Sequence, residues 1–169
     1  MPAIPRPGVR IGQGVDVHRF GDAAAGPLVL AGVTIPGAPR LAGHSDGDAL
    51  LHAVVDALLG AVGLGDIGAL AGVDDPRHAG AGSRVFVDSA LRRLRDAGWV
   101  PGNVDCTVVA ERPRLAPHRA EMVEALARAL DLPPSAVSVK ATTTDGLGLV
   151  GAGEGVACLA VALVHAVPG

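Results

Sequence analysis

The sequence predicts an α+β fold in which one layer of helices covers one β-sheet. Two kinds of pattern lead to this class. Short segments such as 15–18 alternate apolar and polar residues, as half-buried strands do. Longer segments at 83–98 and 119–132 carry apolar residues at helical spacing. No internal repeat or long linker divides the 169 residues, so we expect a single domain that spans 1–169.

The first half of the chain is expected to contain a strand, a hairpin, a helix and a long loop. Their predicted positions are a strand at 10–20, a hairpin at 27–39 turning near Gly32, a helix reaching about Val62, and a loop at 63–83. Ser45 or Asp46 is the expected N-cap of that helix. The loop is long and rich in glycine, which makes it a candidate functional loop.

The second half alternates helices and strands. The predicted elements are a helix at 83–98, a strand at 103–111, a loop at 112–118, a helix at 119–132, a strand at 136–144, a turn at 145–153 and a strand at 154–167. Gly98 is the expected terminator of the first of these helices. The final strand is apolar at nearly every position, which is typical of a strand buried on both faces.

Composition excludes several classes of protein. Hydrophobic residues make up 49% of the chain and aromatic residues only 2%, so the core must consist mainly of Ala, Val and Leu. The net charge of -3 offers no basic surface for nucleic acid or for an anionic membrane. The N-terminal sequence resembles neither a signal peptide nor a membrane span. Cys106 and Cys158 lie in apolar segments and are read as small buried residues. We therefore expect a cytoplasmic protein.

One set of side chains suggests a metal site. Asp16 and His18 are two residues apart in a predicted strand, so both project from the same face. His52 lies inside a predicted helix, where it is either a ligand or a hydrogen-bonded structural residue. One Asp and two His are a reasonable ligand set for Zn²⁺, and three protein ligands leave one tetrahedral position for substrate.

Two short motifs could bind phosphate. The segment KATTTDG, at 140–146, places hydroxyls, a cation and a carboxylate at the end of a strand. Hydroxyls and backbone N–H groups suit phosphate oxygens, and a carboxylate beside phosphates suits a cation such as Mg²⁺. The segment GDIG, at 65–68, offers a carboxylate and N–H groups. Both segments could equally be ordinary structural turns.

Several motifs in this order resemble one enzyme family. They are DVHRF, HSDGDALLHAVVDALLGA, LGDIG, NVDCTVVAERPRLAPH and VKATTTDGLG. The chain resembles the 2-C-methyl-D-erythritol 2,4-cyclodiphosphate synthases of the non-mevalonate isoprenoid pathway, from about Arg10 to Val164. DVH, HSDGD and KATTT together make the resemblance specific.

The resemblance implies an intramolecular phosphoryl transfer. Members of this family convert 4-diphosphocytidyl-2-C-methyl-D-erythritol 2-phosphate into the cyclic diphosphate and release CMP. The 2-phosphate of the substrate attacks its own β-phosphorus, so no protein nucleophile is needed, and catalysis relies on positioning and charge neutralisation. By resemblance, Asp16, His18 and His52 bind one Zn²⁺ per chain, and Asp145 holds a second divalent ion, Mg²⁺ or Mn²⁺, with the substrate.

The resemblance also assigns residues to the substrate. His44 and Thr143 match positions that stabilise the transition state, and Ser45 matches a contact to the erythritol phosphate. Ala110 to Ala116 match the loop that accepts cytosine. The full expected set of substrate contacts is Asp16, Val17, His18, His44, Ser45, Asp66, Ile67, Gly68, Asp74, Asp75, Ala110, Glu111, Arg112, Pro113, Arg114, Leu115, Ala116, Lys140, Thr142, Thr143, Thr144, Asp145 and Leu149.

The family assembly adds two expectations. The resemblance implies a mixed β-sheet with helices on one face, and a homotrimer whose sheets surround the three-fold axis. Each active site would then lie between subunits, with the metal ligands from one chain and the cytidine pocket from its neighbour. For Asp46, Asp48 and Asp56, capping and buried hydrogen bonding are the expected roles.

The sequence departs from the family pattern at three places. Ala71, Gly72 and Val73 stand where Phe-Pro-Asp is common, Asp145 where Glu is usual, and Ala152 where Arg is common. Two other functions stay open beside the synthase. One is a zinc-dependent phosphatase or nucleotidase that uses water as nucleophile. The other is a non-catalytic trimer that binds CMP.

Overall fold

The computed structural model describes the chain apart from residues 1–7, 23, 25, 44–45, 72–81 and 168–169. Its strands are β1 (Val9–Arg19), β2 (Pro27–Leu30), β3 (Val33–Pro39), β4 (Trp99–Val109), β5 (Val137–Thr142) and β6 (Gly155–Ala166). Its helices are α1 (Ala49–Ala61), α2 (Ile67–Ala71), α3 (Arg84–Asp96), α4 (Arg119–Leu130) and α5 (Gly148–Gly151), with 3₁₀ turns η3 (Ala116–His118) and η4 (Pro134–Ala136). None of the described helices is long and apolar enough to span a membrane.

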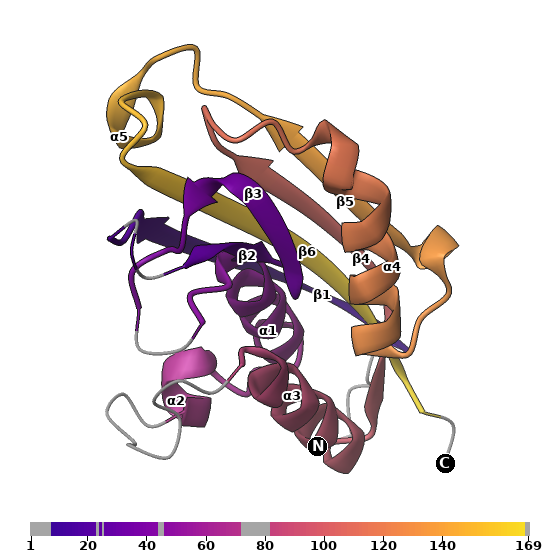
Figure 1. Ribbon diagram of the computed structural model, residues 1–169. Helices are drawn as coiled ribbons and strands as arrows, with labels where there is room; N and C mark the ends of the chain where they lie inside the picture. Colours follow the sequence, from indigo (N-terminus) through magenta and orange to yellow (C-terminus); the bar gives the residue numbers. More distant parts are fainter. Residues whose placement is uncertain (1–7, 23, 25, 44–45, 72–81, 168–169) are drawn as a thin grey trace.

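Four strands form one mixed sheet in the order β1-β6-β4-β5. β6 runs antiparallel to both of its neighbours, whereas β4 and β5 are parallel. Helices α1, α3 and α4 lie on one face, and the β2–β3 hairpin forms a separate two-stranded sheet on the same side (Figure 1). The predicted α+β class, with one helical layer on a mixed sheet, is therefore confirmed.

Several element boundaries differ from the prediction. The loop expected at 63–83 contains the short helix α2, and the turn expected at 145–153 contains α5. β4 begins at Trp99, four residues earlier than predicted, and the ring of Trp99 packs under the guanidinium of Arg10. Gly98 ends α3 as expected, with a φ of 82° that favours glycine and an N–H that donates to the Arg95 carbonyl.

Helix α1 lies directly against β1. Gly12 and Gly14 face the helix, and a methyl group built on either would overlap the backbone carbonyl oxygen of Ala57 or Ala53. The contact is possible because both strand residues lack a side chain and the facing helix residues are alanines. Gly14 meets Ala53 and Gly12 meets Ala57, so the helix and the strand run in opposite directions.

This packing places a histidine over the end of β1. Two residues further along the strand from Gly14 is Asp16, on the same face because side chains alternate. Ala49 lies roughly one turn back along the helix from Ala53, since a turn takes about 3.6 residues, and His52 immediately precedes Ala53. Asp16 and His52 are thereby brought together from positions 36 residues apart.

Asp48 joins α1 to the hairpin. It is the N-cap residue, and its carboxylate accepts a hydrogen bond from the Leu51 N–H at 3.1 Å. The same carboxylate accepts from the N–H groups of Ala31 at 2.9 Å and Gly32 at 2.6 Å in the β2–β3 turn. The predicted cap, Ser45 or Asp46, is therefore wrong. Asp48 takes the N-cap position because its carboxylate also accepts hydrogen bonds from two N–H groups of the hairpin turn.

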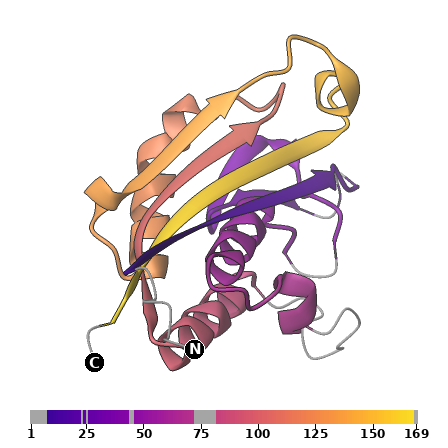
Figure 2. The ribbon, with the colours of Figure 1, turned by 180° about the vertical axis from the view of Figure 1, so that it is seen from behind.

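Among the residues that the structure describes, no helix covers the other face of the sheet (Figure 2). Along β1 the even-numbered residues point to the helices, and the odd-numbered ones point away from them. Four of these outward-pointing residues are exposed and apolar, namely Val9, Ile11, Val15 and Val17. Val161 on the neighbouring β6 is exposed as well. In β6, buried residues alternate with less buried ones, so a single chain buries only one face of this strand and not both.

The pKa of Asp48 yields a stability test. Complete burial raises this pKa from 3.8 to about 6, although three N–H donors oppose the rise. The folded state thus binds the proton more tightly than the unfolded chain does. The resulting stabilisation is fully present below 3.8 and is lost as the pH rises through about 6.

Asp48→Asn cannot titrate, so its stability relative to the wild type should depend on pH. Between about pH 4.5 and about pH 7, the wild type should lose about 2 kcal/mol of unfolding free energy relative to the variant. Urea unfolding followed by Trp99 fluorescence, at one protein concentration and with chelator present, measures the difference. A difference that is constant across this range would contradict the assignment.

Candidate active site

Asp16, His18 and His52 form a compact cluster. The Oδ2 atom of Asp16 lies 2.9 Å from Nε2 of His18 and 3.0 Å from Nδ1 of His52. The three ligand atoms lie within 4.8 Å of one another. β1 supplies the first two residues and α1 the third, so the predicted same-face strand pair and the helix histidine do meet.

The far nitrogen of each imidazole has its own partner. Nδ1 of His18 lies 2.6 Å from the carbonyl oxygen of Ala42, which can only accept a hydrogen bond. Nδ1 of His18 therefore carries a proton. Nε2 donates to Asp16 when the ring is protonated, and it offers its lone pair to a metal ion when the ring is neutral. Nε2 of His52 lies 2.8 Å from the hydroxyl of Ser83.

The electrostatics favour a cation at the centre. Partial burial opposes ionisation of Asp16, but hydrogen bonds from His18 and His52 hold its pKa well below the usual range. The hydrogen bond to Asp16 raises the pKa of His18 above 6.5, against the effect of burial. One carboxylate and two imidazoles with an open side fit a tetrahedral metal such as zinc.

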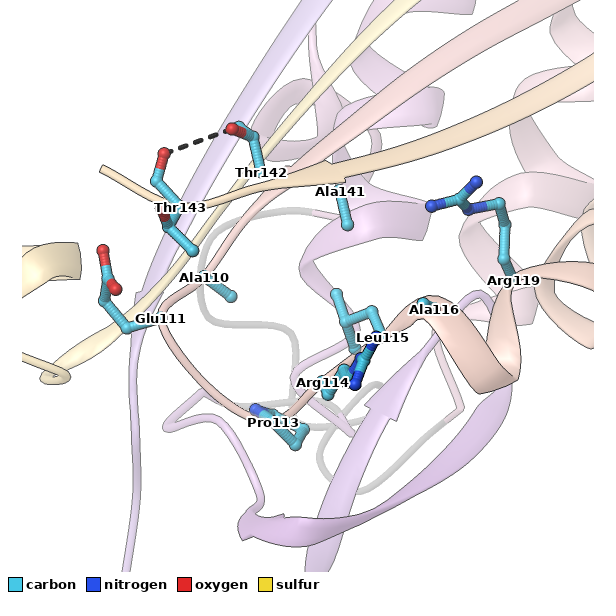
Figure 3. A pocket seen from close by; sticks show the side chains of 10 residues that line it. All are labelled: Ala110, Glu111, Pro113, Arg114, Leu115, Ala116, Arg119, Ala141, Thr142 and Thr143. Carbon is cyan, nitrogen blue, oxygen red and sulfur yellow. Dashed lines mark hydrogen bonds between the residues drawn. The ribbon is translucent and has the colours of Figure 1, made fainter. Parts of the chain in front are cut away.

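A second region lies at the ends of β4 and β5. A hollow of about 390 Å³ is lined by the loop after β4 and by the end of β5 (Figure 3). Its lining residues are Ala110, Glu111, Pro113, Arg114, Leu115, Ala116, Arg119, Ala141, Thr142 and Thr143. The structure thus brings together two segments that the sequence predicted separately, the cytosine loop and the threonine motif. Arg112, on the same loop, points instead toward Gly153, near Ala152.

Glu111 fixes the turn that follows β5. Its Oε1 accepts hydrogen bonds from the Thr144 N–H at 2.9 Å and the Gly146 N–H at 3.3 Å. These bonds lower the pKa of Glu111. Asp145 sits between the two donors with a φ of 53°, and its Oδ1 lies 3.4 Å from the Thr143 hydroxyl. The carboxylate of Glu111 thus holds Thr143 and Asp145 on an ordered turn.

Other predicted contacts lie elsewhere. Val17 and Leu149 line a small hollow beside His18, and Leu149 is itself exposed. Lys140 donates a hydrogen bond to Asp105 at 2.5 Å. It is not among the residues that line the hollow or form the metal cluster. The predictions for His44, Ser45, Asp74 and Asp75 lie outside the described residues.

The chain matches the model of the YgbB family over residues 9–165. This chain belongs to the YgbB family. The 2-C-methyl-D-erythritol 2,4-cyclodiphosphate synthase of Halorhodospira halophila is 53% identical over 161 residues, which cover 95% of this chain and 98% of the relative.

Two solved structures share the fold. The bifunctional IspDF of Campylobacter jejuni matches with a TM-score of 0.87 and 40% identity over 94% of this chain, which spans only 42% of that larger protein. The CDP complex of IspF from Plasmodium falciparum matches with a TM-score of 0.80 and 32% identity, covering 95% of this chain and 98% of that one.

Within the family frame, the acidic residues near α1 have structural roles, as expected. The carboxylate of Asp56 accepts from the Ile67 N–H at 2.7 Å, and that of Asp66 accepts from the Ala69 N–H at 2.9 Å. The segment 66–68 is therefore anchored to α1 at its start. Burial raises the pKa of Asp56.

Ser83 was not predicted from the sequence to belong to the site. This residue precedes α3, where a serine normally caps the helix. Its side chain makes no capping bond to α3 and contacts His52 and Asp46 instead. Its N-cap position was readable from the sequence, but the sequence contained no signal for this other use.

His52→Ala should abolish metal binding. It removes one of three ligands, and the remaining two, Asp16 and His18, are too few to hold the metal. Elemental analysis after dialysis should give about one metal ion per chain in the wild type, with zinc expected from the ligands, and almost none in the variant. His165→Ala is the control, because His165 is exposed and pairs with Val9 at the other end of β1. Full metal occupancy in His52→Ala would refute the site.

Proposed function

We propose that this chain converts 4-diphosphocytidyl-2-C-methyl-D-erythritol 2-phosphate into 2-C-methyl-D-erythritol 2,4-cyclodiphosphate and releases CMP. It is an enzyme of isoprenoid biosynthesis and a phosphorus–oxygen lyase. The proposal rests on one observation. A chain that matches a curated synthase at 53% identity over nearly its whole length also gathers Asp16, His18 and His52 into a metal-ligand set. A cytoplasmic location is part of the same proposal.

The reaction needs positioning more than protein chemistry. An oxygen of the 2-phosphate forms a bond to the β-phosphorus, and the bond from that phosphorus to the oxygen of the CMP phosphate breaks. No water enters. A zinc ion held by Asp16, His18 and His52 would polarise a phosphate oxygen and neutralise its charge. The protein holds the two phosphates in line for the displacement.

The turn after β5 is the proposed binding site for the diphosphate. Thr142, Thr143 and Thr144 supply hydroxyl groups, and Asp145 supplies an exposed carboxylate for the second divalent ion. The side chain of Asp145 is one methylene shorter than that of the usual Glu. Its backbone, with a φ of 53°, lies in a turn that hydrogen bonds to Glu111 hold in place. Thr143 and, by resemblance, His44 would stabilise the developing charge.

Cytosine is proposed to occupy the hollow beside this turn. The loop from Ala110 to Ala116 offers backbone groups that can read the edge of a base, and the cavity is of the size that ligand sites have. The CDP complex of the Plasmodium falciparum relative supports a cytidine nucleotide as the ligand class.

The two halves of the site lie at opposite edges of one sheet. β1 carries the metal ligands and β5 the threonine motif, with β6 and β4 between them. Three strand spacings of about 4.8 Å separate these edges by about 14 Å. This separation supports a site shared between subunits, in which the metal ligands of one chain meet the cytidine hollow of the next.

The products test the function. With the authentic substrate and Mg²⁺ or Mn²⁺, the purified chain should release CMP and the cyclic diphosphate in equal amounts. Asp145→Asn should lower turnover far more than it weakens CMP binding, because the divalent ion that Asp145 holds counters negative charge that develops during the reaction. Inorganic phosphate as product would indicate a zinc-dependent phosphatase or nucleotidase. CMP binding without turnover would indicate a non-catalytic binder.

The exposed apolar face supports a homotrimer. Ile11 is 68% exposed and Val17 is 58% exposed in the single chain, on a sheet face that none of the described helices covers. Large apolar patches of this kind usually mark interfaces. We propose that three such faces pack around a three-fold axis and bury the second face of β6.

Light scattering should give the mass of a trimer for the wild type. Ile11→Glu places a charge in the proposed interface and should shift the mass to that of a monomer, with loss of activity. Val85→Glu is the matched control, because Val85 is 42% exposed on α3, away from that face. An active wild-type monomer would contradict the shared site.

A further inference from the structure

Ser83 connects the metal cluster to the loop before α1. It is fully buried, and its hydroxyl lies between two side chains. On one side is Nε2 of His52 at 2.8 Å, and on the other is Oδ1 of Asp46, which the hydroxyl bonds. The Ser83 backbone N–H also donates to Oδ2 of Asp46 at 2.9 Å.

The direction of these hydrogen bonds follows from the proton count. A carboxylate can only accept, so the single hydroxyl proton of Ser83 goes to Asp46. The serine oxygen then has lone pairs for His52, and Nε2 of His52 must be the donor. With a proton on Nε2, the neutral ring has its lone pair on Nδ1, the atom that faces Asp16 at 3.0 Å, where a metal ion can use it. Without a metal, Nδ1 must also carry a proton to donate to the Asp16 carboxylate.

The ring is also oriented by packing. Phe86, one turn into α3, meets the imidazole of His52 edge-on, with centroids 6.0 Å apart and planes at 74°. Ser83 and Phe86 therefore contact the same ring from one short stretch of chain. The side chain at the capping position of α3 makes no capping hydrogen bond, and its hydroxyl lies beside the histidine instead.

We propose that Ser83 is a positioning residue of the metal site, and that the Asp46–Ser83–His52 chain fixes both the tautomer and the orientation of His52 for metal binding. This inference rests on the metal site of the proposed function. His18 is held by a backbone carbonyl, which no substitution removes. Ser83 is the corresponding partner of His52, and here a side-chain change can test the effect. Outer partners of this kind typically contribute about 10–100-fold to metal affinity.

The test compares Ser83→Ala with Ser83→Thr in the full-length protein. Ser83→Ala removes the acceptor for Nε2, so the Zn²⁺ affinity, measured by competition with a chromophoric chelator, should fall about 10–100-fold. Ser83→Thr keeps the hydroxyl and should restore most of the affinity. Ser138→Ala, at an exposed position on β5, is the control and should bind like the wild type. Wild-type affinity in Ser83→Ala would overturn the proposal.

A second readout separates positioning from general damage. Nitrogen NMR of ¹⁵N-histidine-labelled, zinc-loaded protein reports which nitrogen of His52 binds the metal and which carries the proton. The wild type should show Nε2–H, and Ser83→Ala should show a mixture of tautomers. An Nδ1–H ring in the wild type would refute the inference.

Two further outcomes remain decisive. If the wild type binds no zinc, the proposed metal site fails and the inference fails with it, whereas zinc binding by the wild type with unchanged affinity in Ser83→Ala overturns only the role of Ser83. If Ser83→Ala does not fold, Asp46→Asn replaces it. That variant retains the serine but weakens the bond that orients its hydroxyl, so it should shift both readouts in the same direction. Unchanged readouts in Asp46→Asn would count against the chain.

Discussion

The close contact between α1 and β1 is the constraint on which the site depends. Gly12 and Gly14 allow the helix backbone to rest on the strand without intervening side chains. A helix held away from β1 by intervening side chains would hold His52 farther from the strand. The 3.0 Å contact between His52 and Asp16 therefore exists because two residues of β1 have no side chain.

The metal cluster could be predicted because part of its geometry is local. Asp16 and His18 share a face of a strand whatever the rest of the fold does. His52 joined them through the family resemblance, since spacing alone left a structural histidine open. Ser83 could not be found this way. It lies 31 residues from His52 and 37 from Asp46, and only the packing of α3 on α1 brings them together.

The fold was predictable at the level of elements and less so at their ends. Three polar candidates, Ser45, Asp46 and Asp48, precede α1, and propensity hardly separates them. The hairpin decides for Asp48, because its turn presents two N–H groups that need an acceptor. Likewise the apolar final strand predicted two buried faces, whereas one chain supplies a cover for only one of them.

Helix α1 carries His52 and, one turn later, Asp56, whose carboxylate anchors the segment at 66–68. The metal cluster and the segment 66–68, which the resemblance assigns to the substrate, are thus attached to the same helix. Any change in how α1 packs on β1 would displace the metal ligand His52 and the segment 66–68 together. The spacing between the metal ligand and the segment 66–68 is therefore set by one turn of α1, and the surrounding loops can vary without changing it.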